Sequence, residues 1–352
     1  MKPEYRVPSM KEIEKIPHNG FNVVSTFSGA GGSCLGYRMA GFKVLYANEF
    51  IPAAQETYKS NHPDSYLDTR DIRQVKAKEI LEITSLKEGE IDIFDGSPPC
   101  ASFSTAGKRE AGWGKVKKYS DTEQRVDDLF FEYARLLREL QPKVFIAENV
   151  SGLVKGVAKG YFKIIMQELK SCGYRVKASV LNAKWLGVPQ NRERLIFVGV
   201  REDIGIEPVF PKPFSFFYTL KDAISDLNIK PETETKLTPK TLEIVKKIKP
   251  GQSGSDVLGK NKYFSLRRLE WDKPAGTVQQ SEARMASTNQ IHPDENRKLG
   301  IAELKRVCAF PDDFILTGTF EQQWERLGRA VPPLMMKEIA KTVEREILCK
   351  IV

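Results

Sequence analysis

The chain has 352 residues, of which 41% are hydrophobic, and its 55 Lys and Arg against 46 Asp and Glu give a formal net charge of +9 at pH 7. This length corresponds to one large domain or two moderate ones, and the apolar content excludes a chain that is disordered throughout. No apolar run approaches the roughly 18 residues that a membrane-spanning helix needs.

Short apolar runs alternate with amphipathic segments in the first 200 residues. Helical spacing is found at residues 77–86 and, with an acidic first turn, at residues 127–140. Strands are predicted where apolar residues run together, at residues 21–27, 43–48, 66–67, 91–94, 143–147, 175–181 and 194–200. Strands that alternate with helices predict an α/β fold, a mostly parallel and doubly wound sheet with helices on both faces.

The character of the chain changes after Arg201. Prolines cluster there, and a Lys-rich stretch with several glycines follows at residues 230–262. We therefore predict a large first domain at residues 20–200 and a smaller, more irregular domain at residues 201–300. Helical patterns return in the last part, residues 301–352.

A glycine-rich turn, FSGAGG at residues 27–32, ends the first predicted strand. Small residues let the backbone approach a ligand closely, and the next helix offers free N–H groups. Glu49 lies at the end of the second strand, where a carboxylate can accept both ribose hydroxyls of a nucleoside. Together these features predict a nucleoside cofactor without saying which one. Asp71 and Ile72, near the third strand, either touch the adenine or form a plain turn.

The most specific element is GSPPC at residues 96–100, directly after the strand at residues 91–94. Two prolines stiffen the backbone and hold Cys100 past the carboxyl end of the strand, where ligands bind in open α/β sheets. A thiol in this position is predicted to be a nucleophile. The polar, basic segment at residues 101–122 is either a lid over a polyanion or a solvated loop.

Two further groups follow strands of the same sheet. Glu148 ends the strand at residues 143–147, and a carboxyl group beside a nucleophilic thiol can protonate or hydrogen-bond the base under attack. Taken alone, Glu148 could instead be an acid at a helix N-terminus. Arg192 and Arg194 alternate along an extended segment and could orient a pyrimidine carbonyl or a phosphate, although paired arginines elsewhere mostly form surface ion pairs.

The five cysteines are scattered and form no CxxC pair, and residues 1–20 lack the apolar segment of a secretory signal. These features predict a reduced, intracellular protein, and with only three histidines in the chain no metal site is expected. The positive charge indicates either a polyanionic partner or a solvated basic surface.

With these residues assembled, the chain resembles the cytosine-C5 DNA methyltransferases over nearly its whole length and in the family's motif order. FSGAGG resembles the S-adenosylmethionine loop, GSPPC the nucleophile motif, Glu148-Asn149-Val150 the glutamate motif and QNRER (residues 190–194) the arginine motif. Residues 219–227 and 267–277 resemble the start and the support of a target-recognition domain. Residues 310–314 and 328–333 resemble the closing motif, which returns to the cofactor.

The resemblance implies a Rossmann-like catalytic domain, a target-recognition domain and a C-terminal return. The implied catalytic residues are Cys100, Glu148, Arg192 and Arg194. The implied contacts with S-adenosylmethionine, whose product is S-adenosylhomocysteine, are Phe27, Gly29, Ala30, Gly31, Gly32, Glu49, Phe50, Asp71, Ile72, Ser97, Pro99, Leu129, Arg329 and Val331. The expected contacts with double-stranded DNA are Ser104, Lys108, Arg109, Gln252, Ser253, Lys260, Lys262, Arg268 and Arg284.

The implied reaction is methyl transfer to C5 of a flipped-out cytosine through a covalent adduct between Cys100 and C6. A cytoplasmic, nucleoid-associated bacterial monomer is expected, with no metal and no membrane contact, whose DNA site a cognate restriction endonuclease can share. Three residues depart from the family pattern: Ala101 for Gln, Ala302 for Arg and Arg329 for Asn. The rival hypotheses are a tRNA methyltransferase, a non-catalytic DNA-binding protein and a nicotinamide-dependent oxidoreductase.

Overall fold

The computed structural model describes residues 2–99, 116–118, 123–125, 128–155, 158–259, 263–284 and 287–351. The chain divides into two compact units. We call the larger one the sheet unit; it contains Glu14–Leu181, Glu193–Lys212 and Met336–Val352. The other, the loop-rich unit, contains Met1–Ile13, Asn182–Arg192 and Pro213–Met335.

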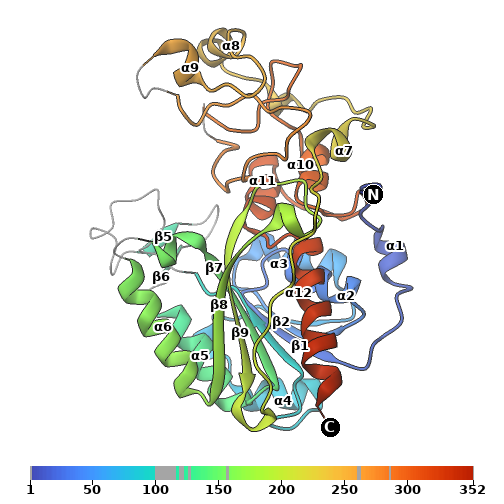
Figure 1. Cartoon of the computed structure of the whole chain (residues 1–352), viewed down its shortest axis with the longest axis vertical. Coiled ribbons are helices and arrows are strands. Elements are labelled where there is room, and N and C mark those ends of the chain that lie inside the picture. Colours follow the sequence, from blue (N-terminus) through green and yellow to red (C-terminus); the bar gives the residue numbers. More distant parts are fainter. Residues whose placement is uncertain are drawn as a thin grey trace. The chain divides into compact units, whose positions relative to one another are not determined.

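The sheet unit is built around a seven-stranded sheet in the order β3-β2-β1-β4-β7-β9-β8 (Figure 1). The strands are β1 (Asn22–Thr26), β2 (Lys43–Asn48), β3 (Tyr66–Asp68), β4 (Ile93–Gly96), β7 (Val144–Val150), β8 (Tyr174–Asn182) and β9 (Glu193–Arg201). The pairs from β3 to β7 are parallel, whereas β9 runs antiparallel to β7. Two short strands, β5 (Val116–Lys118) and β6 (Glu123–Arg125), form a separate antiparallel pair.

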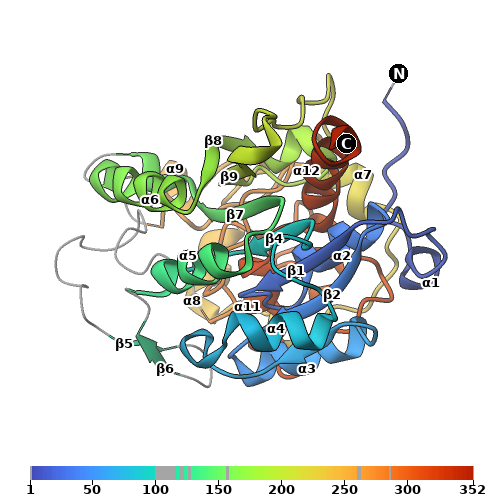
Figure 2. The same cartoon turned by 90° about the horizontal axis from the view of Figure 1, so that it is seen from below.

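Helices cover both faces of this sheet, as Figure 2 shows along its edge. One face carries α4, α5 and α6, and the other carries α2 and α12. The helices around the sheet are α2 (Gly32–Met39), α3 (Pro52–Asn61), α4 (Ala77–Thr84), α5 (Leu129–Leu140), α6 (Lys159–Ser171) and α12 (Pro333–Glu346).

The core of the sheet unit lies under α4, α5 and α6. Phe94, Tyr133 and Phe145 are fully buried in it, and β7 is buried along almost its whole length. Strands buried on both faces are typical of parallel sheets that helices cover. This core therefore fixes the strand ends, from which the candidate site residues project.

The loop-rich unit consists of short helices, isolated bridges and loops. Its helices are α1 (Met10–Ile13), α7 (Leu220–Ile224), α8 (Pro239–Val245), α9 (Gly254–Leu258), α10 (Ile301–Val307) and α11 (Phe320–Arg329). A small apolar cluster contains Ile244, Val245, Ile248, Leu266 and Ile291. Because this cluster is small, polar contacts carry much of the structure here.

The sequence patterns predicted the seven strands of the main sheet within a few residues but not β5 and β6, and the α/β fold class is confirmed. The antiparallel pairing of β9 is a difference in detail from a sheet expected to be mostly parallel. The sequence patterns did not indicate six of the described helices, α1, α3, α6, α8, α9 and α11. In α11 the buried apolar side chains Phe320, Trp324 and Leu327 recur at the i, i+4 and i+7 spacing of a helix, so the sequence does carry a signal for it. The domain boundaries at residues 200 and 300 stay a prediction.

Candidate active site

The glycine-rich turn after β1 is held in an unusual backbone conformation. Phe27, Gly29 and Gly31 all have positive φ angles, of 52°, 56° and 85°. A Cβ on Gly29 would point into open space, whereas a Cβ on Gly31 would lie 2.2 Å from His62 Nε2. The turn therefore has one side packed on His62 and one open side. A left-handed Phe is strained, and such strain gathers at binding and catalytic sites.

Glu49 connects this turn to the end of β2. Its carboxylate accepts the Gly29 N–H at 2.7 Å and the Ile51 N–H at 2.6 Å, and the residue is buried. The predicted acid therefore lies directly at the glycine turn. Of the other residues predicted to contact the cofactor here, Ala30 and Gly32 are buried, whereas Phe27 and Phe50 are partly exposed.

The predicted adenine contacts come from two chain segments that pack together in the core of the sheet unit. Ile72 begins the short 3-10 helix Ile72–Gln74, and Leu129 is the first residue of α5; both are buried. The carboxylate of Asp71 accepts the N–H of Arg73 at 3.0 Å. The structure thus brings all three residues together.

The GSPPC loop is fixed to the ends of two strands. A Cβ on Gly96 would lie 2.6 Å from the ring of Tyr133 and 2.7 Å from Thr26 Oγ1, so only glycine fits. The Asn149 side-chain amide, which follows Glu148 on β7, donates to the Pro98 carbonyl at 3.2 Å. Ser97 and Pro99 are partly exposed beside it. The loop therefore leaves the sheet next to Glu148.

Glu148 and Arg194 form an ion pair at this edge of the sheet. Arg194 Nε lies 2.7 Å from Glu148 Oε1, and the two side chains are 13% and 11% exposed. They come from β9 and β7, which pair across Val150 and Arg194. Two of the predicted catalytic side chains are thus in contact.

Arg192 has a different environment from Arg194. Its side chain is buried in the loop-rich unit and donates to the Val278 carbonyl at 3.1 Å and to the Gly328 carbonyl at 2.7 Å. The chain passes from the loop-rich unit to the sheet unit between Arg192 and Glu193. Although Arg192 and Arg194 alternate in the sequence, their guanidinium groups contact different partners: backbone carbonyls for Arg192 and the Glu148 carboxylate for Arg194.

A buried carboxyl group, Asp95, was missed by the sequence reasoning. It lies one residue before Gly96 and accepts the Tyr37 hydroxyl and the Ser25 hydroxyl, both at 3.0 Å. Burial raises the pKa of Asp95 to about 7. The signal in the sequence is an acid that directly follows the apolar pair Ile93-Phe94 within β4, IFDG.

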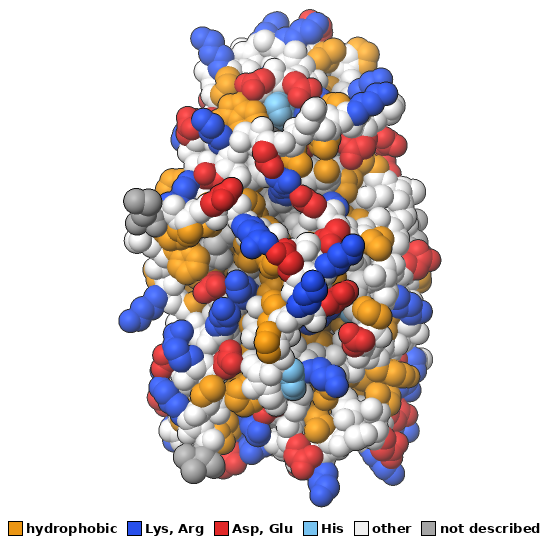
Figure 3. All heavy atoms as spheres, turned by 90° about the vertical axis from the view of Figure 1, so that its right-hand side faces the viewer, with side chains coloured by type: hydrophobic (Ala, Val, Ile, Leu, Met, Phe, Trp, Pro, Cys, Tyr) orange, Lys and Arg blue, Asp and Glu red, His pale blue; other side chains and the backbone are white. Residues whose placement is uncertain are grey.

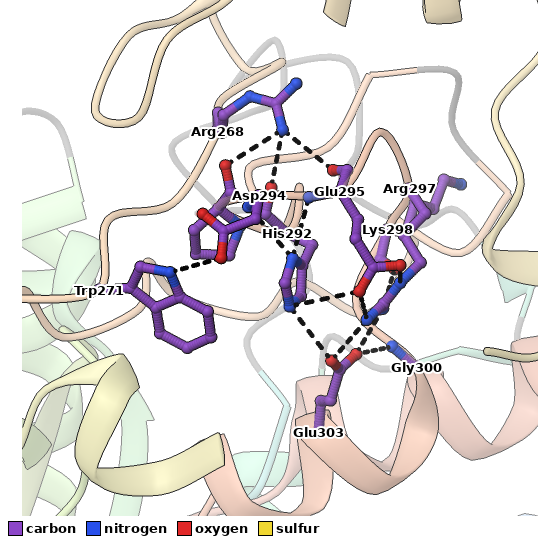
Figure 4. Close-up of polar contacts among 10 residues, drawn as sticks. Arg268, Trp271, His292, Asp294, Glu295, Arg297, Lys298, Gly300 and Glu303 are labelled. Carbon is purple, nitrogen blue, oxygen red and sulfur yellow. Dashed lines mark hydrogen bonds and ion pairs between the residues drawn. The ribbon is translucent and has the colours of Figure 1, made fainter. Parts of the chain in front are cut away.

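The residues predicted to contact DNA have several different environments. Arg268 is only 5% exposed, and it donates to the His292 carbonyl at 3.0 Å (Figure 4). It also donates to the carbonyls of Ile248 and Val245 at 2.7 and 2.8 Å and to the side chain of Asn296. Ser253 is buried as the N-cap of α9. Arg284 is exposed and Gln252 is partly exposed. The guanidinium of Arg268 is thus part of the interior of its unit, where its hydrogen bonds go to the protein rather than to a phosphate.

The remaining predicted residues fall into two groups. Those outside the described residues are Cys100, Ser104, Lys108, Arg109, Lys260 and Lys262. Arg329 and Val331 belong to the loop-rich unit, where Arg329 pairs with Glu325 at 2.7 Å and Val331 is buried. Their contact with the cofactor stays a prediction.

Two negative findings concern the described residues. No group of three or more His, Cys, Asp or Glu side chains among them is arranged to hold a metal ion. No helix in the described part of the chain is long and apolar enough to cross a membrane.

The open α/β sheet carries a glycine turn, an acid after β2 and an Arg–Glu ion pair beside GSPPC. Together these features define the kind of site that a nucleoside-dependent transferase has. The profile of the C-5 cytosine-specific DNA methylases matches residues 21–345. The chain belongs to this family, whose members use S-adenosylmethionine, and it is a DNA cytosine-C5 methyltransferase.

Individual relatives agree with the family. The type II methyltransferase M.Eco47II of Escherichia coli is 34% identical, with 94% of this chain and 80% of that protein covered. M.NgoPII of Neisseria gonorrhoeae is 30% identical over 96% of this chain and 99% of its own length. Among solved structures, a Spodoptera frugiperda DNMT2 mutant shares the fold, with a TM-score of 0.68, 18% identity and coverage of 92% of this chain and 100% of the other.

Proposed function

We propose that this enzyme methylates a flipped-out cytosine in a specific duplex DNA site through a covalent adduct between Cys100 and C6. The observation that carries the proposal is the Arg194–Glu148 ion pair, at 2.7 Å, next to the loop that leads into Cys100. A carboxyl group held by one arginine beside a nucleophile is the arrangement that activation of a pyrimidine needs.

The residues around the glycine turn fit S-adenosylmethionine. The open side of Gly29 leaves room for a ligand against the backbone, and Glu49 provides a carboxylate for ribose hydroxyls. Ile72 and Leu129, which are buried in the same apolar cluster, are the proposed apolar neighbours of the adenine ring, and Phe50 is the proposed aromatic one. When bound, the cofactor supplies an electrophilic methyl group.

The protein groups have separate tasks in this proposal. The Cys100 thiolate adds to C6, which makes C5 nucleophilic. Glu148 holds N3 and offsets the charge that develops on the ring, with help from Arg194. Once C5 carries the methyl group, loss of the C5 proton and expulsion of the thiolate restore the double bond. Arg192 acts at a distance, because its carbonyl contacts fix the segments at Val278 and Gly328.

The DNA must be distorted for this chemistry. A stacked cytosine is out of reach, so the base flips out at a cost of a few kcal/mol. Base reading is proposed for residues 228–265 and 279–284, where Arg284 is exposed. Lys108, Arg109, Lys260 and Lys262 are proposed phosphate contacts, Gln252 is a proposed base or backbone contact, and Ser104 is a further proposed DNA contact.

The cellular context follows from the relatives' names. Several are type II methyltransferases, so we propose a cytoplasmic, monomeric enzyme that protects a site shared with a restriction endonuclease. Direct contact with that endonuclease is not part of the proposal. No metal is assigned to the reaction.

The first test replaces the proposed nucleophile. We expect Cys100→Ala to abolish label transfer from S-adenosylmethionine to DNA while duplex binding remains, because only the covalent step is lost. Cys349→Ala, which changes an exposed cysteine, is the matched control and should keep full activity. Substantial turnover by Cys100→Ala would remove Cys100 from the mechanism, and transfer to tRNA rather than DNA would overturn the substrate.

A further inference from the structure

Arg73 links two chain segments that meet in the core of the sheet unit. Its Nη1 lies 2.9 Å from Asp71 Oδ2, and its Nε and Nη2 lie 3.0 Å and 2.5 Å from the two carboxylate oxygens of Asp128. Asp71 precedes the 3-10 helix Ile72–Gln74, and Asp128 precedes α5. One guanidinium therefore bridges the starts of two elements that are far apart in the sequence.

Asp128 is used in an unexpected way. An Asp directly before a helix usually accepts a backbone N–H of the first turn and so caps the helix. At α5 the Asp128 side chain makes no such cap bond, and its carboxylate instead faces Arg73. The Asp128 side chain thus contacts the segment at residues 71–74 and does not cap α5.

The bridge adds little to folding stability. The side chains of Arg73, Asp71 and Asp128 are 29%, 19% and 44% exposed, and ion pairs this accessible to water stabilise proteins only weakly. The same two segments are already attached by Arg135, which donates to the carbonyls of Ile72 and Val75 at 3.2 and 2.9 Å. The planar guanidinium group of Arg73 fixes the relative orientation of the two carboxylates more than it raises the stability of the fold.

We propose that Arg73 is a positioning residue for the nucleoside end of the cofactor, because it fixes Ile72 and Leu129 in one arrangement. Arg73 lies next to Ile72 in the chain, and its partner Asp128 lies next to Leu129. The bridge thus joins the neighbours of these two apolar side chains through a single guanidinium group. The inference rests on the proposed function, since it takes S-adenosylmethionine as the ligand.

The test measures binding rather than turnover. S-adenosylhomocysteine is titrated calorimetrically into the full-length wild type, Arg73→Ala, Asp128→Asn and the double variant, and the Tm of each ligand-free protein is recorded. We expect each single variant to weaken binding about tenfold with a Tm close to that of the wild type. The double variant should bind no more weakly than either single one, because both changes break the same bridge.

A matched control lies on the same helix. Arg138 pairs with Glu168 at 2.7 Å on the outer part of α5, so Arg138→Ala removes a similar ion pair away from the site and should leave binding unchanged. Unaltered affinity in Asp128→Asn, or losses that add in the double variant, would overturn the proposal. A wild type that does not bind S-adenosylhomocysteine would instead overturn the cofactor assignment itself.

Discussion

Asp95 is a buried acid directly before the GSPPC loop, and its pKa is raised to about 7. Burial is the main cause of its raised pKa, the hydrogen bonds from Tyr37 and Ser25 lower that pKa in part, and the charge of Glu148 raises it. The folded state therefore binds the Asp95 proton more tightly than the unfolded chain, whose Asp has a pKa near 4. A neutral carboxyl group here avoids a second negative charge close to Glu148.

The sign of this shift gives a pH prediction. The contribution of protonated Asp95 to the free energy of unfolding is fully present below about pH 4. It is lost as the pH rises toward about 7. Asp95→Asn can keep both hydrogen-bond partners without ionising. We expect it to unfold at a higher denaturant concentration than the wild type at pH 8, with a gap that shrinks as the pH falls to 5.

The difference in unfolding midpoint between the wild type and Asp95→Asn at each pH cancels the pH response of the groups that the two proteins share. Asp203→Asn is the control, because Asp203 is an exposed residue whose pKa its partner Arg201 lowers. It should give a small change of the opposite sign that is the same at pH 5 and pH 8, because Asp203 is ionised in the folded and the unfolded chain at both. A gap for Asp95→Asn that is the same at pH 5 and pH 8 would contradict a buried neutral acid.

At the scale of elements, buried charges organise the loop-rich unit. Arg268 donates to carbonyls of the segment at residues 292–295 (Figure 4). It also donates to the carbonyls of Val245, the last residue of α8, and Ile248, so it connects the two segments. Beside it, Glu303 accepts from Arg297 at 2.7 Å and from the Gly300 N–H. These contacts supplement a small apolar cluster.

Two arginines of this unit are expected to respond in opposite ways. Removal of Arg268 leaves several buried carbonyls without donors, so Arg268→Ala should lower the free energy of unfolding by about 3 kcal/mol. Arg284→Ala should leave stability unchanged, weaken DNA binding, and reduce the slope of log K against log salt concentration by about 1 if Arg284 contacts one phosphate. A reduced salt slope in a folded Arg268→Ala variant would return Arg268 to the DNA surface.

The sequence predicted some elements and contacts better than others, for physical reasons. Strand ends could be located because apolar runs stop at polar residues, and Glu49 and Glu148 were found in this way. The burial of Arg268 could not be predicted, since a charged residue in a Lys-rich segment reads as a surface group. The contact between Arg73 and Asp128 could not be predicted either, because nothing local pairs residues so far apart in the chain.

At the scale of the whole molecule, net charge is a poor guide to where DNA binds. On the face that Figure 3 shows, Lys and Arg side chains are interspersed with Asp and Glu rather than gathered in one patch. The net charge of +9 is thus a small difference between 55 basic and 46 acidic residues. Local phosphate contacts, rather than the total charge, should set the salt dependence of binding.

The path of the chain makes a prediction about independent folding. The loop-rich unit takes in three separate stretches, and two of them come from far outside its main segment, residues 213–335. Gln190 is fully buried there and donates to Cys308 Sγ at 3.2 Å, and the Tyr5 hydroxyl donates to the Arg306 carbonyl at 2.6 Å. A fragment of residues 213–335 alone lacks these partners.

We therefore expect that fragment to lack a cooperative thermal transition by circular dichroism. A single chain that joins residues 2–13, 182–192 and 213–335 through flexible Gly/Ser linkers should recover one, because it restores the buried Gln190 contacts and the contacts of the N-terminal arm. Gln190→Ala within the joined chain is the control, and it should lower the midpoint because the Cys308 contact is lost. If the bare fragment melts as sharply and at the same temperature as the joined chain, residues 2–13 and 182–192 are not integral parts of this unit.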